Sequence, residues 1–259
     1  MNNNQNIKDE ILSIVIPCFN EAKNIPILVD HIYKSFSEEK IIKKNTCPIK
    51  IIIINNGSTD NTADILKSLY GKYSFLEIYS ISKNIGYGYG ILKGLNLANT
   101  PYIGWSHADL QTDMRDIIKA LRIIEFNKEN LKLFIKGERK NRNYFDNFFS
   151  IGMSLFESTL FGIPLYEINA QPTIFHRSLL DNGFEAPFDF SLDLYIYIMA
   201  KIKKYSIKRF NVEFKQRIYG TSKWNTNWRS KLKFILRTLK FSLKLRRKIL
   251  YKNYYINRK

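Results

Sequence analysis

The sequence predicts an α/β fold with a mostly parallel central sheet that is flanked by helices. Short apolar runs rich in β-branched residues alternate with segments of helical periodicity between residues 11 and 126. This alternation is typical of β-α-β units, whose crossover helices cover both faces of a parallel sheet. A polar cluster also follows each apolar run. Because ligands of such sheets bind at the carboxyl ends of the strands, the same pattern predicts where a site lies.

The first strand is predicted over residues 11–17, where ILSIVIP is apolar and β-branched and ends at a proline. Residues 24–36 have the apolar spacing of an amphipathic helix. Residues 49–62, IKIIIINNGSTDNT, read as a second buried strand, a turn and the start of another helix. Asp60 or Thr59 is the expected N-cap of that helix, because a side-chain oxygen there can accept from a free backbone N–H group.

The later elements follow the same logic. Residues 75–81 and 101–105 are apolar enough for two further strands, and 113–126 has helical periodicity. Residues 86–98 form a glycine-rich helix, in which we interpret the glycines as sites of close packing. No acidic residue stands at a strand end about 20 positions on, as a dinucleotide-binding fingerprint requires. The less regular remainder is predicted as a strand at 131–139, an apolar helix at 145–163, and segments at 169–180, 188–202 and 205–225.

Composition fits a globular protein with an ordinary core. Hydrophobic residues make up 45% and aromatic residues 14% of the 259 residues. Cys18 and Cys47 have neither metal-site spacing nor the number needed for a disulfide framework, so we expect a reducing compartment. Residues 1–10 lack the apolar segment of a signal peptide, and no apolar run approaches the ~18 residues of a membrane-spanning helix.

The positive charge is concentrated at the end of the chain. The net charge is +18, yet residues 201–259 contain twenty Lys and Arg and a single acid, so residues 1–200 are nearly balanced. Such a basic appendage indicates an anionic partner, such as a lipid surface or a phosphorylated substrate. Nucleic acid also fits the charge, but no base-reading module is recognisable, so no nucleic-acid partner is predicted.

Helical periodicity places the charges of residues 231–250 on one side. At about 100° per residue, the basic residues fall in one stripe and the apolar residues lie on both of its flanks. This pattern favours a helix that lies in a membrane interface. A helix docked on the rest of the protein with a solvated basic face is the alternative. The stripe consists of Lys233, Arg237, Lys240, Lys244, Arg247 and Lys248.

The segment GWSHADLQTD follows the strand predicted at 101–105. His107, Asp109 and Gln111 alternate, so on an extended segment their side chains point to one side. Such ligands can hold a hard cation or a diphosphate, although the same residues could simply cap the next helix. Since CFNE, NNGSTD and SKN likewise follow predicted strands, we favour one shared site.

Six of these segments occur in an order that resembles the family-2 glycosyltransferases. They are VIPCFNE, NNGSTDNT, NIGYGYGILKGL, ADLQ, GER and RIYGTSK, and they span residues 11–223. The resemblance is strongest to members that transfer a sugar to a polyprenyl phosphate. It implies a Rossmann-like GT-A domain over 1–223, followed by a basic amphipathic helical tail over 224–259.

The resemblance also implies a reaction and partners. The donor would be a nucleotide-sugar, with UDP favoured over GDP, and transfer would invert the anomeric centre. The acceptor would be a polyprenyl phosphate, and the protein would sit peripherally on the anionic cytoplasmic face of the membrane. Two alternatives stay open: transfer to a sugar hydroxyl of a surface glycan such as lipopolysaccharide or capsule, and a catalytically inactive binding protein. Whether the chain forms a homo-oligomer is also open.

Roles for individual residues come from the same resemblance. Those implied to bind the nucleotide-sugar are Pro17, Asn20, Glu21, Asn55, Asn56, Lys83, Asn84, Ala108 and Asp109. Those implied to bind a divalent metal are His107, Asp109 and Gln111. The acceptor phosphate is implied to contact Arg139, Arg217, Ser222 and Lys223. The residues implied to take part in the transfer step are Asp109, Arg217, Lys223 and Asp193.

The sequence departs from the family pattern at two places. Asn55 and Asn56 stand where the family has DD before GSTD, and an amide offers a donor as well as an acceptor. His107 stands where the family has the first aspartate of a DAD motif. Hard Mg²⁺ prefers oxygen ligands, whereas imidazole suits Mn²⁺ better. The expected cofactor is therefore Mg²⁺ or Mn²⁺, unless His107 contacts the diphosphate directly.

Overall fold

The computed structural model describes residues 10–43, 46–140, 144–180, 186–219 and 228–256. The chain divides into two compact units, the first formed by residues 1–141 with 169–219 and the second by 142–168 with 220–259. This grouping sets 142–168 apart from the domain 1–223 that the sequence suggested. The domain boundary expected at residue 223 lies outside the described residues and stays a prediction.

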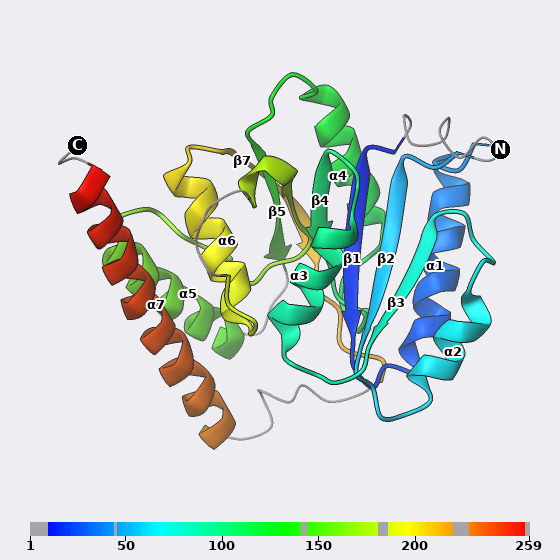
Figure 1. Ribbon diagram of the computed structural model, residues 1–259, viewed down its shortest axis with the longest axis horizontal. Helices are drawn as coiled ribbons and strands as arrows, with labels where there is room; N and C mark the ends of the chain where they lie inside the picture. Colours follow the sequence, from blue (N-terminus) through cyan, green and yellow to red (C-terminus); the bar gives the residue numbers. More distant parts are fainter. Residues whose placement is uncertain (1–9, 44–45, 141–143, 181–185, 220–227, 257–259) are drawn as a thin grey trace. The chain divides into compact units, whose positions relative to one another are not determined.

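A seven-stranded sheet in the order β3-β2-β1-β4-β6-β5-β7 forms the centre of the first unit (Figure 1). Neighbouring strands are parallel except at β6, which is antiparallel to both β4 and β5. The prediction of a mostly parallel sheet is therefore confirmed. The strands are β1 (Leu12–Cys18), β2 (Ile49–Asn56), β3 (Leu76–Ile81), β4 (Tyr102–Trp105), β5 (Leu133–Lys140), β6 (Thr173–His176) and β7 (Ser206–Glu213).

Alternate side chains of β1 supply the cores on the two faces of the sheet. Leu12, Ile14 and Ile16 belong to the same buried cluster as apolar residues of α1 and α4. On the other face α3 packs against β1 and β2, and a Cβ atom added at Gly94 would collide with the Val15 side chain (Figure 1). The helices of this unit are α1 (Asn24–Glu38), α2 (Thr62–Leu69), α3 (Tyr87–Leu97), α4 (Arg115–Phe126) and α6 (Ser191–Ile202).

The start of α2 shows how local sequence fixes a helix end. Asp60 Oδ1 accepts a hydrogen bond of 3.0 Å from the N–H of Thr62, the first helical residue. The N-cap residue is Asn61, so the prediction of Asp60 or Thr59 at that position is wrong, although Asp60 still accepts from the N–H of the first helical residue. Burial raises the pKa of Asp60, but hydrogen bonds from Thr62 and Ala22 outweigh this effect and leave it lowered.

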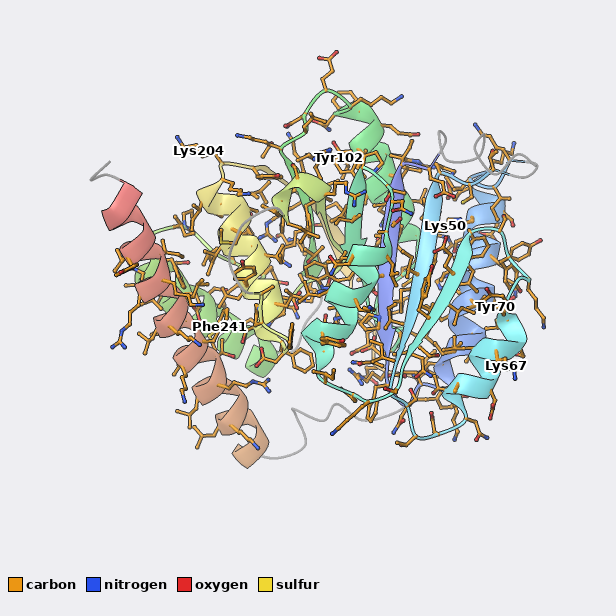
Figure 2. The ribbon with its side chains drawn as sticks, in the orientation of Figure 1. Lys50, Lys67, Tyr70, Tyr102, Lys204 and Phe241 are labelled. Atoms are coloured by element: carbon orange, nitrogen blue, oxygen red, sulfur yellow. The ribbon has the colours of Figure 1, made fainter. Side chains whose placement is uncertain are left out.

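The opposite end of β2 carries a charged cluster. The ammonium of Lys50 (Figure 2) lies 2.9 Å from a carboxylate oxygen of Glu10 and 3.5 Å from one of Glu77. These pairs connect β2 to β3 and to the segment before β1. The cluster lies at the amino end of β2, away from the predicted site.

The second unit contains α5 (Tyr144–Phe161) and α7 (Trp228–Ile256), which run side by side (Figure 1). The Ser242 hydroxyl of α7 donates a 2.7 Å hydrogen bond to the buried carboxylate of Glu157 on α5. Burial raises the pKa of Glu157 to about 7, and the hydrogen bond from Ser242 opposes this shift. Leu245 and Ile249 are also buried, so one predicted apolar flank of α7 is covered by protein.

Candidate active site

The loops that follow β1 and β2 are joined by hydrogen bonds. Cys18 at the end of β1 pairs with Asn55 of the parallel strand β2, so both loops leave the same edge of the sheet. Asn20 adopts a left-handed conformation with φ of 59°. Its Oδ1 accepts a 2.8 Å hydrogen bond from Thr59 N, and its own N–H donates to Ser58 Oγ at 3.0 Å. Asn20 thus shapes the loop, while its contact with a nucleotide stays a prediction.

Glu21 lies near two other predicted site residues. Its N–H donates to Thr62 Oγ1 at 2.9 Å, and its carboxylate accepts from the Asn24 side chain. Burial raises the pKa of Glu21 most strongly, and the Asn24 hydrogen bond opposes this. The negative charge of Asp109 raises it further and the positive charge of Arg217 lowers it. The structure therefore brings Glu21, Asp109 and Arg217 together at this edge of the sheet.

Asn55 and Asn56 at the end of β2 have different environments. Asn55 Oδ1 accepts from Ser58 N at 3.1 Å, and its Nδ2 donates to Ser80 Oγ at 3.4 Å. Asn56 Nδ2 donates a 2.9 Å hydrogen bond to the carbonyl of Gly86. Asn56 Oδ1 is buried and has no partner among the described residues. The amide at position 56 is thus required as a donor, and its oxygen is the group left to bind a ligand.

We predict that Asn56→Asp destabilises the fold by about 1–3 kcal/mol at neutral pH. A buried carboxylate at this position would oppose the Gly86 carbonyl without donating to it. The loss should shrink at acid pH, because a protonated carboxyl can donate and burial raises the pKa of such a group. Urea unfolding measures it, and Asn55→Asp is the matched control. The Ser80 hydroxyl can turn to donate to a carboxylate at position 55, so an equal loss in both variants would contradict the prediction.

The remaining nucleotide-binding candidates surround this point. A Cβ atom added at Gly90 would lie 3.1 Å from Asn56 Nδ2 and 3.5 Å from Pro17 Cβ, so Pro17 and Asn56 are neighbours. The side chains of Lys83 and Asn84 are exposed, and their backbone passes against Gly57. Ala108 lies in the apolar core. Its side chain therefore serves packing, and only its backbone is left for a nucleotide.

Asp109, Gln111 and Arg217 form a tight polar group. Asp109 is 5% exposed, and its Oδ2 lies 2.7 Å from Arg217 Nη2. Arg217 Nε donates to Gln111 Oε1 at 3.0 Å. Gln111 Nε2 donates to the carbonyl of Lys215 at 3.0 Å, and Lys215 N donates to the carbonyl of Gln111 at 2.9 Å. The segment between β4 and α4 is thus hydrogen-bonded to the segment after β7, and both contact the Arg217 guanidinium.

The same group tests whether the chain fits a divalent metal. Asp109 Oδ2 and Gln111 Oε1 both face the positive charge of Arg217. Carboxylate and amide oxygens are ligands that Mg²⁺ and Mn²⁺ accept, so the two atoms fit a cation that takes the place of the guanidinium. Across the described residues, no three His, Cys, Asp or Glu side chains come together as a metal-binding group. A diphosphate would therefore have to supply further ligands.

His107 belongs to a stack of aromatic rings. Its ring stacks on Tyr87 with 5.7 Å between centroids, and Tyr87 stacks on Phe190 at 4.4 Å. Burial raises the pKa of Tyr87, and the charges of Asp193 and Asp109 raise it further, which places Tyr87 near both carboxylates. Alternation along an extended segment predicted one direction for His107 and Asp109. The structure instead puts the imidazole against Tyr87 and the Asp109 carboxylate against Arg217.

The other predicted site residues are placed as follows. Asp193 at the start of α6 is 2% exposed, and its Oδ1 accepts a 2.6 Å hydrogen bond from Gln171 Nε2. Arg139 lies near the carboxyl end of β5, with its guanidinium 5.6 Å from the centre of the Phe214 ring. Ser222 and Lys223 lie outside the described residues, so their assignment to the acceptor phosphate stays a prediction.

Sequence reasoning missed four residues that shape this region. Lys136 interrupts the apolar run of β5 and is fully buried, and a lysine inside a predicted buried strand is a detectable signal. Gln171 is a polar residue two positions before β6 and is 2% exposed. Tyr87 and Phe190 carry no local signal, because their stacking joins segments far apart in the sequence.

Comparison with known proteins places the chain among glycosyltransferases. The model of the family "Glycosyl transferase family 2" matches residues 13–181. A dolichyl-phosphate beta-glucosyltransferase of Dictyostelium discoideum is 28% identical over 169 residues, which are 61% of this chain and 51% of that protein. An undecaprenyl-phosphate 4-deoxy-4-formamido-L-arabinose transferase of Yersinia enterocolitica is 30% identical over 115 residues, 44% of this chain and 33% of that protein. The chain thus matches about half or less of the length of these relatives.

Solved structures show the same GT-A fold. A glucosyl-3-phosphoglycerate synthase from Mycobacterium tuberculosis, solved with Mn²⁺, UDP and phosphoglyceric acid, superposes with a TM-score of 0.65 at 15% identity. The match covers 92% of this chain and 78% of that one. The mannosyltransferase PcManGT from Pyrobaculum calidifontis, in complex with GDP-Man and Mn²⁺, gives 0.59 at 15% identity, covering 81% and 58%. On its family match and its fold, the chain belongs to glycosyl transferase family 2.

Proposed function

We propose that the protein transfers a sugar from a nucleotide-sugar to a polyprenyl phosphate at a membrane surface. The observation that carries this proposal is the convergence of Glu21, Asp109, Gln111 and Arg217 at the carboxyl edge of the sheet. The group combines carboxylate and amide oxygens with a guanidinium, which is the chemistry that binds a diphosphate through a cation and through direct hydrogen bonds. The relatives named for dolichyl and undecaprenyl phosphate support the acceptor class.

The position of Asp193 favours an anionic acceptor over a sugar hydroxyl. A hydroxyl acceptor needs a general base within hydrogen-bond reach, and Asp193, which the family resemblance implies in the transfer step, is the candidate for that base. Its carboxylate is buried and accepts from Gln171, so it is not presented to a substrate. A phosphate oxygen is already anionic at neutral pH and attacks the anomeric carbon without a base. The buried Asp193 therefore supports the phosphate acceptor, and the glycan acceptor remains the second candidate.

Stabilisation of the departing diphosphate is the main chemical task. Preorganised cations and hydrogen-bond donors stabilise the negative charge that develops on the leaving phosphate. A divalent cation bound with Asp109 and Gln111 would supply Lewis-acid stabilisation of that charge. Arg217, released from these two oxygens, would then donate its N–H groups to phosphate oxygens. Arg139 near the end of β5 would hold the acceptor phosphate, and Lys223 would assist.

Incubation of the purified chain with radiolabelled UDP- and GDP-sugars and polyprenyl phosphate tests the reaction. Label that becomes chloroform-soluble is the expected result, and we expect UDP-sugars to be better donors than GDP-sugars. Inversion would appear as a product anomer opposite to that of the donor. Label on an added glycan would instead favour the hydroxyl acceptor. A lack of transfer and hydrolysis with both Mg²⁺ and Mn²⁺ would favour a catalytically inactive binding protein.

The second unit has the surface expected of a membrane-bound helix. All six residues of the basic stripe on α7 are exposed, and the adjacent Leu232, Leu236, Leu243 and Leu250 are 45–57% exposed. On α5, Ile151 and Leu155 are 64% and 68% exposed. Basic residues beside exposed apolar ones favour the interface of an anionic membrane. None of the described helices is both long enough and apolar enough to span a bilayer. We propose peripheral binding at the cytoplasmic face.

We predict that replacing Lys233, Arg237, Lys240 and Lys244 by Gln strongly weakens binding to anionic vesicles. Each basic residue near such a surface contributes about 1 kcal/mol, so four of them correspond to roughly a thousandfold in affinity. Sedimentation with phosphatidylserine-containing vesicles measures the change. The control replaces four exposed lysines of the first unit, Lys34, Lys40, Lys67 and Lys72, and alters the net charge equally. Equal weakening by both variants would show that net charge, not α7, determines binding.

A further inference from the structure

Lys136 is an unexpected charge in the interior of the first unit. It lies in β5, is 0% exposed, and its ammonium donates to the carbonyl of Ala170 at 2.9 Å and to Thr173 Oγ1 at 2.8 Å. The ammonium also lies 5.9 Å from the centre of the Tyr197 ring. A buried ammonium is strongly unfavourable unless its charge is balanced and its protons are hydrogen-bonded. Its enclosure excludes direct contact with a substrate, so any role must act through its neighbours.

The carboxylate of Asp193 is a buried negative charge that interacts with this ammonium. Burial raises the pKa of Asp193, and the charge of Lys136 is the largest effect that opposes the increase. The same short segment serves both groups, because Ala170 and Thr173 accept from Lys136 while Gln171 donates to Asp193. Gly137 permits this approach, since a Cβ atom there would collide with the Gln171 carbonyl. Lys136, Gln171 and Asp193 thus form one buried polar network.

The network reaches the candidate active site through Asp193. After Lys136, the charge of His107 is the next effect that lowers the pKa of Asp193, so the carboxylate lies near the imidazole. The negative charges of Asp193 and Asp109 both raise the pKa of Tyr87, and the Tyr87 ring stacks on His107. Phe190 directly precedes α6 and stacks on Tyr87, so the first turn of α6, which carries Asp193, lies beside the aromatic stack that includes His107. A change in the Asp193 carboxylate would therefore alter the electrostatic environment of His107.

We propose that Lys136 is a positioning residue, whose buried charge fixes the Asp193 carboxylate and thereby the orientation of His107 beside the transferred group. The catalytic part of this inference rests on the proposed sugar transfer. The structural part does not, because the pairing of Lys136 with Asp193 and the placement of His107 can be measured without a substrate. A solely structural Lys136 would stabilise the fold but leave His107 unaffected.

The test compares Lys136→Met, Asp193→Asn and the double variant in the full chain. Each single change removes one of two opposite buried charges and leaves the other, so we expect both to lower the urea midpoint clearly. The double variant removes both charges and should recover most of the loss. A double variant whose loss equals the sum of the two single losses, or which fails to fold, overturns the pairing. Lys132→Met is the matched control, because this exposed lysine lies one residue before β5.

Two further measurements separate positioning from stability. The chain has three histidines, so NMR of ¹⁵N-labelled histidine should show His107 signals that shift in Lys136→Met while those of His31 and His176 stay. In transfer assays, Lys136→Met should lower kcat about 10-fold and leave the KM for the nucleotide-sugar unchanged. Unmoved His107 signals overturn the proposal. If no variant and not even the unaltered chain transfers sugar, the proposed function fails, and the urea and NMR results still decide the role of Lys136.

Discussion

Asp109→Asn is expected to lower sugar transfer by roughly 100- to 1,000-fold while the fold persists. The carboxylate lies 2.7 Å from the Arg217 guanidinium, and it supplies one of the two oxygens that face the cationic position. An amide keeps the shape of the side chain but removes the negative charge that would bind a cation with the diphosphate. Initial rates at saturating nucleotide-sugar measure the effect.

Two checks show whether the loss of transfer in Asp109→Asn comes from the site: the stability of this variant and a control variant at an exposed aspartate. Arg217 is 28% exposed, so water can solvate its guanidinium when Asp109 loses its charge, and the urea midpoint should change little. Asp64→Asn removes an equal charge from an exposed position on α2 and should leave transfer unchanged. Full transfer by Asp109→Asn would refute the role of this carboxylate in binding the diphosphate.

Gly57→Ala is expected to destabilise the protein by about 3 kcal/mol. Gly57 has φ of 68°, a conformation in which a side chain is strained. An added Cβ atom would lie 2.6 Å from Lys83 C and 2.9 Å from Lys83 Cα, and it would also collide with Asn84 N. All three are backbone atoms, so the strand-end segment after β3 has to move. Urea unfolding measures the loss.

A second glycine separates the two causes of this loss. Gly71 has a similar φ of 73°, but no atom lies within 4 Å of the position that its Cβ would take. Gly71→Ala therefore reports conformational strain alone, which we expect to cost about 1–2 kcal/mol. Equal losses in the two variants would show that the contact with Lys83 and Asn84 contributes nothing to stability.

The sequence predicted the framework of the first unit because its signals are local. Apolar runs, helical periodicity and turn residues lie within short windows, and the boundaries of the strands and helices predicted between residues 11 and 139 differ from the observed ones by at most two residues. The edge of the sheet that carries the site was also predictable. Residues that follow parallel strands must emerge at one edge, and the pairing of Cys18 with Asn55 brings their loops together.

The roles of side chains within the site were less accessible. Asn20 was predicted to contact a nucleotide, but its side chain accepts a hydrogen bond from Thr59 of the neighbouring loop. Asp193, a candidate base, is buried and accepts from Gln171. Neither outcome follows from residue type or spacing, because the partner lies 39 residues away in the first case and 22 in the second.

The sequence by itself determined the α/β architecture, the polar edge of the sheet and the basic helix, since periodicity and strand direction dictate each of them. Only the tertiary structure decided which oxygens face Arg217, which ring stacks on His107 and which carboxylate interacts with Lys136. Gln111 and Arg217 are 106 positions apart and still share a hydrogen bond of 3.0 Å. Such pairs depend on which distant strands are neighbours in the sheet, and local sequence patterns do not specify that order.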